Sequence, residues 1–255
     1  MGVISVERQR KIQELIGEDK RISVTTICEV FSISEATARR DLASLAAEGK
    51  IQRIHGGAIE TEESPPELPI LERAKDQGVY KEMIARAAAQ LIERGDTVFL
   101  GSGTTVLETA RHLRECEGLT ILTNSLPIIN LLVDCTGITL IVLGGMLRNS
   151  ELSFIGHITD QALNEVRADK VILGARAISL EHGITNEYLP ETLTDRAIIK
   201  IGRQVILVAD HTKFGSVSTA FLAPLEALTT IVTDSQTDME FIQSIQQRGV
   251  EVVVA

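Results

Sequence analysis

The stretch from Ser32 to Gly57 reads SISEATARRDLASLAAEGKIQRIHGG, and it decides the fold of the first part of the chain. Ser34 is a good N-cap for a helix over residues 35–47, because its hydroxyl can accept a hydrogen bond from the first turn. Gly49 suits the end of that helix. The alternating residues that follow, and the glycines at the end of the stretch, predict a two-stranded wing. We therefore expect the second helix of a helix-turn-helix, followed by a wing.

The predicted helix has two different faces. Ala38, Leu42 and Leu45 recur at spacings of four and three, which places them together on a buried face. An arginine on the opposite face can fork onto a guanine edge in the major groove of DNA, and a threonine or serine can reach a base or a phosphate. That opposite face is small, polar and basic, and consists of Ala36, Thr37, Arg39, Arg40 and Ser44.

Two shorter helical patterns come before this stretch, and Ser23 or Thr25 can cap the second of them. Residues 21–23 look like the short strand that often precedes this helix in winged domains. An amphipathic helix pair with a solvated charged face is the simpler interpretation, and two adjacent arginines alone do not exclude it. The apolar residues at helical spacing are Ile12, Leu15 and Ile16 in the first helix, and Ile27, Val30 and Phe31 in the second.

The spacing of individual residues favours DNA binding over that simpler interpretation. Arg8, Ile12 and Ile16, then Ser34 and Thr37-Ala-Arg-Arg-Asp-Leu42, and then His55-Gly-Gly-Ala58, resemble the signature of the DeoR family of bacterial transcriptional regulators. The resemblance implies that Asp41 orients an arginine rather than touching DNA. We expect double-stranded operator DNA to be contacted by residues of the helix and the wing, namely Ser34, Thr37, Arg39, Arg40, Lys50, Arg53 and His55.

Charge divides the chain into two parts. Residues 1–60 contain nine Lys or Arg and nine Asp or Glu, so the whole formal charge of −10 belongs to the remainder. Such an acidic remainder does not bind nucleic acid by itself. The length of 255 residues suits two domains. We predict a winged helix-turn-helix domain over 1–58, an acidic, proline-rich linker over 59–71, and an α/β effector-sensing and oligomerisation domain over 72–255.

The composition is typical of a cytoplasmic protein. The longest apolar runs are of strand length, far short of the roughly 20 residues that span a bilayer. The N-terminus has no apolar signal core. Three cysteines lack the spacing of a zinc site or a disulfide framework, and the five histidines are equally scattered. We therefore expect no metal, no cofactor and no membrane partner.

From residue 97 onwards, short apolar runs alternate with helical segments. This alternation predicts a Rossmann-like α/β domain, in which helices cover both faces of a mainly parallel sheet. Ligands of such sheets bind at the carboxyl ends of the strands. The expected strands cover residues 97–101, 119–124, 138–144, 170–175, 204–210, 230–234 and 251–254.

The first of these strands ends in Gly101-Ser-Gly-Thr-Thr105 and leads directly into a helix. Its glycines let the backbone approach a ligand, its hydroxyls can donate hydrogen bonds, and the N–H groups at the helix start favour an anion. The motif lacks the third glycine of a dinucleotide fingerprint and the lysine of a Walker loop. A tight strand-to-helix turn with a threonine cap is the alternative.

Motifs at the other strand ends resemble the sensor domain of the DeoR family in order and spacing. That domain is related to the folds of ribose-5-phosphate isomerase and glucosamine-6-phosphate deaminase, and family members typically respond to phosphorylated sugars. The resemblance implies that Ser102, Gly103, Thr104 and Thr105 hold a phosphate, and that Asn124, Gly145, Arg148 and Lys213 line the rest of the pocket. A surface position after a strand is the alternative for Lys213. The motifs are Thr123-Asn-Ser125, Gly144-Gly-Met-Leu-Arg148, Ser153-Phe-Ile-Gly156, Gly174-Ala-Arg-Ala177, Gly183-Ile-Thr185 and Ala209-Asp-His-Thr-Lys-Phe-Gly215.

Two positions depart from the family pattern. Relatives usually read Gly-Ala-Asp-Gly where this chain has Gly174-Ala-Arg-Ala177, and Glu-Ala-x-x-Lys-Arg where it has Glu191-Thr-Leu-Thr-Asp-Arg196. Arg176 stands where the family pattern has an acidic residue, and Asp195 stands where it has a basic one. Arg176 and Asp195 therefore either form an inverted pair in the pocket or changed independently on the surface. We include Arg176 and Glu191 among the expected effector-binding residues.

These patterns predict a sequence-specific transcriptional regulator, a repressor of a carbohydrate-metabolism operon that responds to a phosphorylated sugar. One winged domain makes few DNA contacts, so a homo-oligomer, either a dimer or a tetramer, is expected. The alternative is a sugar-phosphate isomerase-like enzyme with an accessory DNA-binding domain. It would need a carboxylate base such as Asp210 or Glu191 and a cation such as Lys213. Because Arg176 stands where an acid is expected, we predict no catalytic residue.

Overall fold

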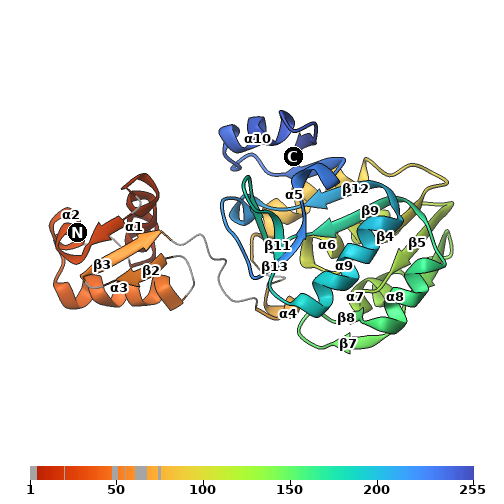
Figure 1. Cartoon of the computed structure of the whole chain (residues 1–255), viewed down its shortest axis with the longest axis horizontal. Coiled ribbons are helices and arrows are strands. Elements are labelled where there is room, and N and C mark those ends of the chain that lie inside the picture. The colour runs from red at the N-terminus through yellow and green to blue at the C-terminus, as the bar shows by residue number, and fades with distance from the viewer. Residues whose placement is uncertain (1–4, 20, 48–50, 55, 61–67, 74–75) are drawn as a thin grey trace. The chain divides into compact units, whose positions relative to one another are not determined.

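The computed structural model describes residues 5–19, 21–47, 51–54, 56–60, 68–73 and 76–255. The chain divides into two compact units, one within residues 1–66 and the other within residues 67–255 (Figure 1). Each unit has a hydrophobic core of its own. We call them the N-terminal unit and the sensor unit.

The N-terminal unit combines helices with a small antiparallel sheet. Its core contains Ile12, Ile16, Ile27, Leu42 and Leu45, which come from all of its described helices. The sheet has the strand order β1-β3-β2. This arrangement confirms the predicted winged helix-turn-helix. The elements are α1 (Ser5–Asp19), β1 (Arg21–Ser23), α2 (Val24–Phe31), α3 (Glu35–Ala47), β2 (Ile51–Ile54) and β3 (Gly57–Glu60).

Regular structure reaches into both ends of the range that the sequence predicts as a linker. Strand β3 continues to Glu60, because Ile59 and Glu60 pair with residues of β1 and β2. Helix α4 (Ile70–Arg73) begins the sensor unit, and Ile70 is buried. Residues 61–67 of the predicted linker lie outside the described residues, as do Lys50 and His55 of the predicted DNA contacts.

A seven-stranded sheet forms the centre of the sensor unit, with the strand order β15-β14-β12-β9-β4-β5-β6. Each neighbouring pair is parallel. Each apolar run predicted as a strand corresponds to one strand of this sheet, which confirms the predicted fold class. The strands are β4 (Thr97–Leu100), β5 (Leu119–Thr123), β6 (Ile138–Val142), β9 (Ala168–Gly174), β12 (Gly202–Val208), β14 (Thr230–Thr233) and β15 (Glu251–Val254).

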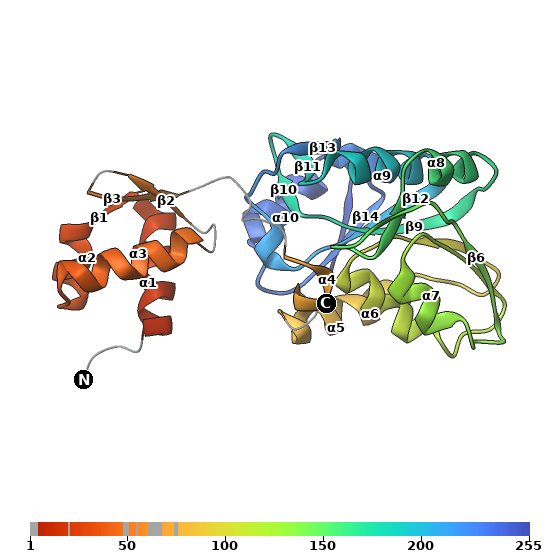
Figure 2. The same ribbon diagram turned by 90° about the horizontal axis from the view of Figure 1, so that it is seen from below.

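Helices cover both faces of this sheet (Figure 2). Val98 and Leu100 of β4 share one core with α5 (Gly78–Ala89), α6 (Thr104–Leu113) and α7 (Leu126–Leu132). Phe99 points the other way, into a core shared with α8 (His157–Asn164), α9 (Leu189–Ile201) and α10 (Met239–Gln246). This alternation follows from the two-residue repeat of a strand. Among the described residues, no helix is both long and apolar enough to cross a membrane.

Shorter elements, which were not predicted from the sequence, connect the strands of the large sheet. Strands β7 (Met146–Arg148) and β8 (Ser153–Ile155) form a hairpin. Strands β10 (Ala177–Ser179), β11 (Gly183–Asn186) and β13 (Ala220–Ala223) form a small antiparallel sheet. The 3-10 helices are η1 (His211–Lys213) and η2 (Leu225–Ala227). Elements of three or four residues are too short to show a hydrophobic period.

Candidate functional sites

Helix α3 presents a polar, basic face to solvent in the N-terminal unit. Ser34 caps the helix, since its hydroxyl accepts a hydrogen bond from the backbone N–H of Thr37 at 3.3 Å. Ala38, Leu42 and Leu45 are buried on the opposite side, as the spacing predicts. The exposed surface of the helix and wing includes Ser34, Arg39, Arg40 and Arg53, while Thr37 is half-buried.

A buried ion pair joins α3 to α1. Asp41 is only 4% exposed, and the Nε atom of Arg8 lies 2.7 Å from its carboxylate. Gln9 also donates to the same carboxylate at 3.3 Å. Asp41 therefore pairs with an arginine inside the unit, in agreement with the role that the family resemblance implies. By contrast, Arg39 pairs with Glu35 on the exposed surface of the helix at 3.3 Å.

A pocket lies in the sensor unit at the carboxyl ends of β4, β9 and β12. Ligand sites of open parallel sheets are expected at this edge. Charged and polar side chains dominate its wall. The lining residues are Arg73, Lys81, Ser102, Gly103, Thr104, Thr105, Glu151, Leu173, Gly174, Ala175, Arg176, Asn186, Glu187, Glu191, Asp195, Val208, Ala209, Asp210 and Lys213.

The first turn of α6 forms one wall of the pocket. Gly103 precedes the helix with a φ of +117°, a conformation that side chains other than glycine rarely adopt. Thr104 and Thr105 follow directly, and both are buried. The free N–H groups of a helix start carry a partial positive charge. This wall therefore favours an anion.

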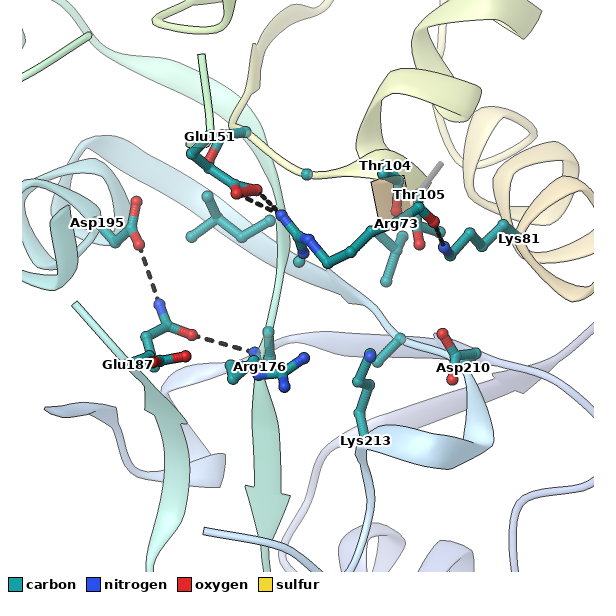
Figure 3. Close-up of a pocket in the computed structure, with 18 of the residues that line it drawn as sticks. Arg73, Lys81, Thr104, Thr105, Glu151, Arg176, Glu187, Asp195, Asp210 and Lys213 are labelled. Carbon is teal, nitrogen blue, oxygen red and sulfur yellow. Dashed lines mark hydrogen bonds and ion pairs between the residues drawn. The ribbon is translucent and has the colours of Figure 1, made fainter. Parts of the chain in front are cut away.

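Three cations, which we call the cation cluster, come together near this helix start: Arg73, Lys81 and Lys213 (Figure 3). Lys81 is 5% exposed, and its ammonium group donates to the backbone carbonyl of Arg73 at 2.7 Å. Burial lowers the pKa of Lys81 most, and the charges of Lys213 and Arg73 lower the pKa further, whereas Asp210 counteracts them. An anion bound here would relieve the repulsion among the three cations.

Two aspartates fix the turn that presents Lys213. Asp210 accepts a hydrogen bond from the backbone N–H of Thr212 at 3.0 Å and thereby caps η1. Asp234 accepts from the backbone N–H of His211 at 2.9 Å, and its carboxylate also lies 3.0 Å from His211 Nδ1. Lys213 thus projects into the pocket from η1, which the two aspartates hold in place (Figure 3). Its place in the pocket wall argues against an incidental surface position.

The opposite end of the pocket is acidic. The side-chain amide of Asn186 accepts from the backbone N–H of Arg176 and donates to the carboxylate of Asp195, each at 3.1 Å (Figure 3). Asp195 is buried, and Glu187 also belongs to the pocket wall. Arg176 and Asp195 thus both line the pocket and are connected through Asn186, so neither lies on the open surface. Their direct pairing stays a prediction.

Seven of the ten residues expected to bind an effector line this pocket: Ser102, Gly103, Thr104, Thr105, Arg176, Glu191 and Lys213. Asn124, Gly145 and Arg148 are absent from the lining. The Asn124 side chain is buried and donates to the carbonyl of Phe154 at 2.9 Å, which fixes β5 to β8. Arg148 forms an ion pair with Glu191, which does line the pocket. The Cζ atom of Arg148 also lies 4.6 Å from the centroid of the Tyr188 ring.

Two family models match the chain in the same order as its two units. The DeoR-like helix-turn-helix domain matches residues 8–64, and the DeoR C terminal sensor domain matches residues 76–235. The transcriptional repressor AccR of Agrobacterium fabrum is 37% identical over 91% of this chain and 90% of its own length. The chain belongs to the DeoR family.

A second regulator matches nearly the whole chain as well. The glycerol-3-phosphate regulon repressor of Escherichia coli is 32% identical over 96% of this chain and 97% of its own length. Ribose 5 phosphate isomerase A of Neisseria gonorrhoeae is 16% identical, covers 53% of each chain and has a TM-score of 0.40. Named regulators match this chain over nearly its full length, and a DNA-binding domain is part of the match. The DeoR-family chain is therefore a DNA-binding regulator and not an isomerase with an accessory domain.

Gly145 of this DeoR-family protein has a packing role. A Cβ atom at Gly145 would lie 2.1 Å from Thr159 Oγ1 and 2.9 Å from the carbonyl oxygen of Ile155. We therefore expect Gly145→Ala to lower the free energy of unfolding by about 1–3 kcal/mol in chemical denaturation, as overpacking does. Gly144→Ala is the matched control, because no atom lies within 4 Å of the added methyl group. An equal loss in both variants would contradict the packing role.

The pocket also contains residues that the sequence analysis did not assign to it. Lys81 carried a detectable signal, because it shares a buried helical stripe with Ile84, Ala85 and Ala88, where a lysine is unexpected. Arg73 lies on a helix of one turn, which has no readable pattern. The other residues reach the pocket through contacts with distant parts of the chain, and a single sequence does not reveal such contacts. These others include Glu151, Asn186 and Glu187.

Proposed function

We propose that this DeoR-family regulator is a cytoplasmic repressor of a carbohydrate-metabolism operon, and that a phosphorylated sugar releases it from its operator. The observation that carries the proposal is the convergence of the cation cluster on the N-terminus of α6. A dianionic phosphate can accept hydrogen bonds from backbone N–H groups, hydroxyls and cations at the same time. Ser102, Gly103, Thr104 and Thr105 are the proposed phosphate ligands, together with Lys81 and Lys213.

The acidic end suits the rest of such a ligand. Carboxylate and amide oxygens accept hydrogen bonds from sugar hydroxyls, and Glu187, Asp195 and Asn186 present such oxygens in the pocket wall. The wall contains four Arg or Lys and five Asp or Glu side chains, so its net charge does not attract an anion indiscriminately. A ligand that is anionic at one end and rich in hydroxyls at the other matches this division best.

The N-terminal unit supplies the DNA contacts in this proposal. The exposed face of α3 enters the major groove, where Arg39, Arg40, Ser34 and Thr37 meet bases and phosphates. Arg53 of the wing binds the backbone, and Lys50 and His55 are proposed from the family pattern alone. Two or more copies bind repeated half-sites as a dimer or tetramer. Both relatives described above are named as repressors, which supports repression over activation.

The affinity for a phosphorylated sugar should depend on pH through Lys81. Because the pKa of Lys81 is lowered, this side chain loses its proton at a lower pH than an ordinary lysine. A sugar phosphate is already dianionic above about pH 7, since its second pKa is about 6. Its affinity, measured by calorimetry, should therefore fall as the pH rises from about 7.5 towards 10. Lys81→Arg should flatten this fall because arginine stays protonated; an equal fall in both proteins would contradict the assignment.

A thermal-shift screen of phosphorylated sugars, each paired with its unphosphorylated counterpart, tests the proposed function. A ligand present at 100 times its dissociation constant adds about 2.7 kcal/mol of stability. We expect at least one phosphorylated sugar to stabilise the full chain while its counterpart does not. Stabilisation by the unphosphorylated sugar to the same extent, or by no sugar phosphate of the set, would count against the proposal.

A further inference from the structure

The turn of the β7–β8 hairpin holds helix α4 by two contacts. The guanidinium group of Arg73 donates to both carboxylate oxygens of Glu151. The backbone N–H of Ile70 donates to the carbonyl of Ser150 at 2.8 Å. Glu151 is only 3% exposed, so its charge is little screened by solvent. The beginning of the sensor unit is thus fixed to the hairpin beside the pocket.

Arg73 and Glu151 also belong to the pocket wall. Arg73 is a member of the cation cluster, which is the proposed partner of the effector phosphate. A guanidinium fork binds a phosphate as readily as a carboxylate. A dianionic phosphate and the Glu151 carboxylate repel each other strongly at the same guanidinium group, because both are shielded from solvent. A phosphate bound in the pocket would therefore compete with Glu151 for Arg73.

We infer that Glu151 is an internal competitor for Arg73, and that the anionic group of the effector takes Arg73 from it. This inference rests on the proposed function of the pocket. The exchange removes the side-chain contact between α4 and the hairpin and so loosens α4. Helix α4 is the first described element after the N-terminal unit in the sequence. Loosening it is the step by which occupancy of the pocket changes DNA binding.

Lys81 reinforces the same exchange. Its ammonium group donates to the backbone carbonyl of Arg73, which is the last residue of α4. A phosphate that attracts Lys81 therefore weakens a second contact of α4. A second buried pair near the pocket, Arg148 with Glu191, differs because Arg148 is not a lining residue of the pocket. The competition is therefore assigned to Arg73 and not to Arg148.

The first test compares Glu151→Gln with the matched control Glu187→Gln in the full chain, using inorganic phosphate as the probe in isothermal titration calorimetry. Both changes remove one carboxylate from the same pocket wall. Glu151→Gln should bind phosphate about tenfold more tightly than the wild type, within the usual range of coupling between sites. Glu187→Gln should change the affinity much less.

The outcomes separate the exchange from the pocket itself. Equal affinity in the wild type and Glu151→Gln, or an equal gain in both variants, overturns the competition and leaves the phosphate pocket in place. Phosphate binding by none of the three proteins overturns both the phosphate pocket and the exchange.

The second test needs no variant, so it holds even if Glu151→Gln folds poorly. Amide hydrogen exchange is followed at Ile70, whose N–H bonds to Ser150, with and without saturating phosphate. We expect phosphate to accelerate exchange at Ile70 and to leave the remote amide of Gly118, which bonds to Gly137 at 2.9 Å, unchanged. Unchanged or slower exchange at Ile70 overturns the inference.

Discussion

Asp41→Ala should lower the free energy of unfolding of the N-terminal unit by about 3–5 kcal/mol, the usual effect of removing one partner from a buried ion pair. The carboxylate of Asp41 is the partner of the guanidinium group of Arg8, and both side chains are almost fully shielded from solvent. Arg8 would be left as an unpaired charge between α1 and α3. Hydrogen exchange of the backbone amides in these helices measures the loss.

Two controls distinguish the loss of a charge partner from a general sensitivity of the N-terminal unit to substitution. Glu35→Ala removes an exposed pair with Arg39 on the same helix and should change the unfolding free energy by no more than about 0.5 kcal/mol. Arg8→Met combined with Asp41→Leu removes both charges and should regain most of the stability. If the double variant is as unstable as Asp41→Ala, the pair is not the cause.

Arg40→Ala should weaken specific operator binding by about 1–3 kcal/mol, which is roughly 5- to 150-fold in affinity. Arg40 is exposed on α3, on the side opposite the buried residues Ala38 and Leu42. Its loss should also relax the preference for one base of the half-site, because a base contact and not a phosphate contact is removed. Fluorescence anisotropy with an operator selected from random DNA, and with single-base variants of it, measures both effects.

Arg10→Ala is the matched control for this prediction. Arg10 is equally basic and exposed, but it lies on α1 and pairs with Glu14. It should lose little operator affinity, and neither variant should change the affinity for a phosphorylated sugar. Operator affinity in Arg40→Ala equal to that of the wild type would contradict the assignment of α3.

The sequence predicted the helix-turn-helix and the parallel sheet because both depend on local patterns. The cap at Ser34 and the buried stripe of Ala38, Leu42 and Leu45 are set by residues within one helix. The strands of the large sheet are apolar runs of four to seven residues, and such runs are visible without knowledge of their neighbours. The position of the pocket followed from a general rule for open sheets.

The details of the pocket could not be predicted, because they depend on contacts between residues that are far apart in the chain. Asn124 follows a strand of the sheet, as Ser102 and Gly103 do, but its side chain turns to Phe154. Arg73 reaches Glu151 across 78 positions of sequence. The antiparallel strands β10, which begins directly after Arg176, and β11, which ends at Asn186, were not recognised from their short sequences. Patterns within single elements therefore identified the pocket wall at the start of α6 better than the acidic end.

The most direct test of the account is operator release in the wild type and in Lys213→Ala, measured by anisotropy with a phosphorylated sugar found in the thermal-shift screen. The two proteins should bind the operator equally without the sugar, because Lys213 belongs to the sensor unit. The sugar should weaken operator binding by the wild type by roughly 5- to 150-fold and should have little effect on the variant. Equal release of both proteins, or equal release by the unphosphorylated sugar, would contradict the claim that this pocket controls DNA binding.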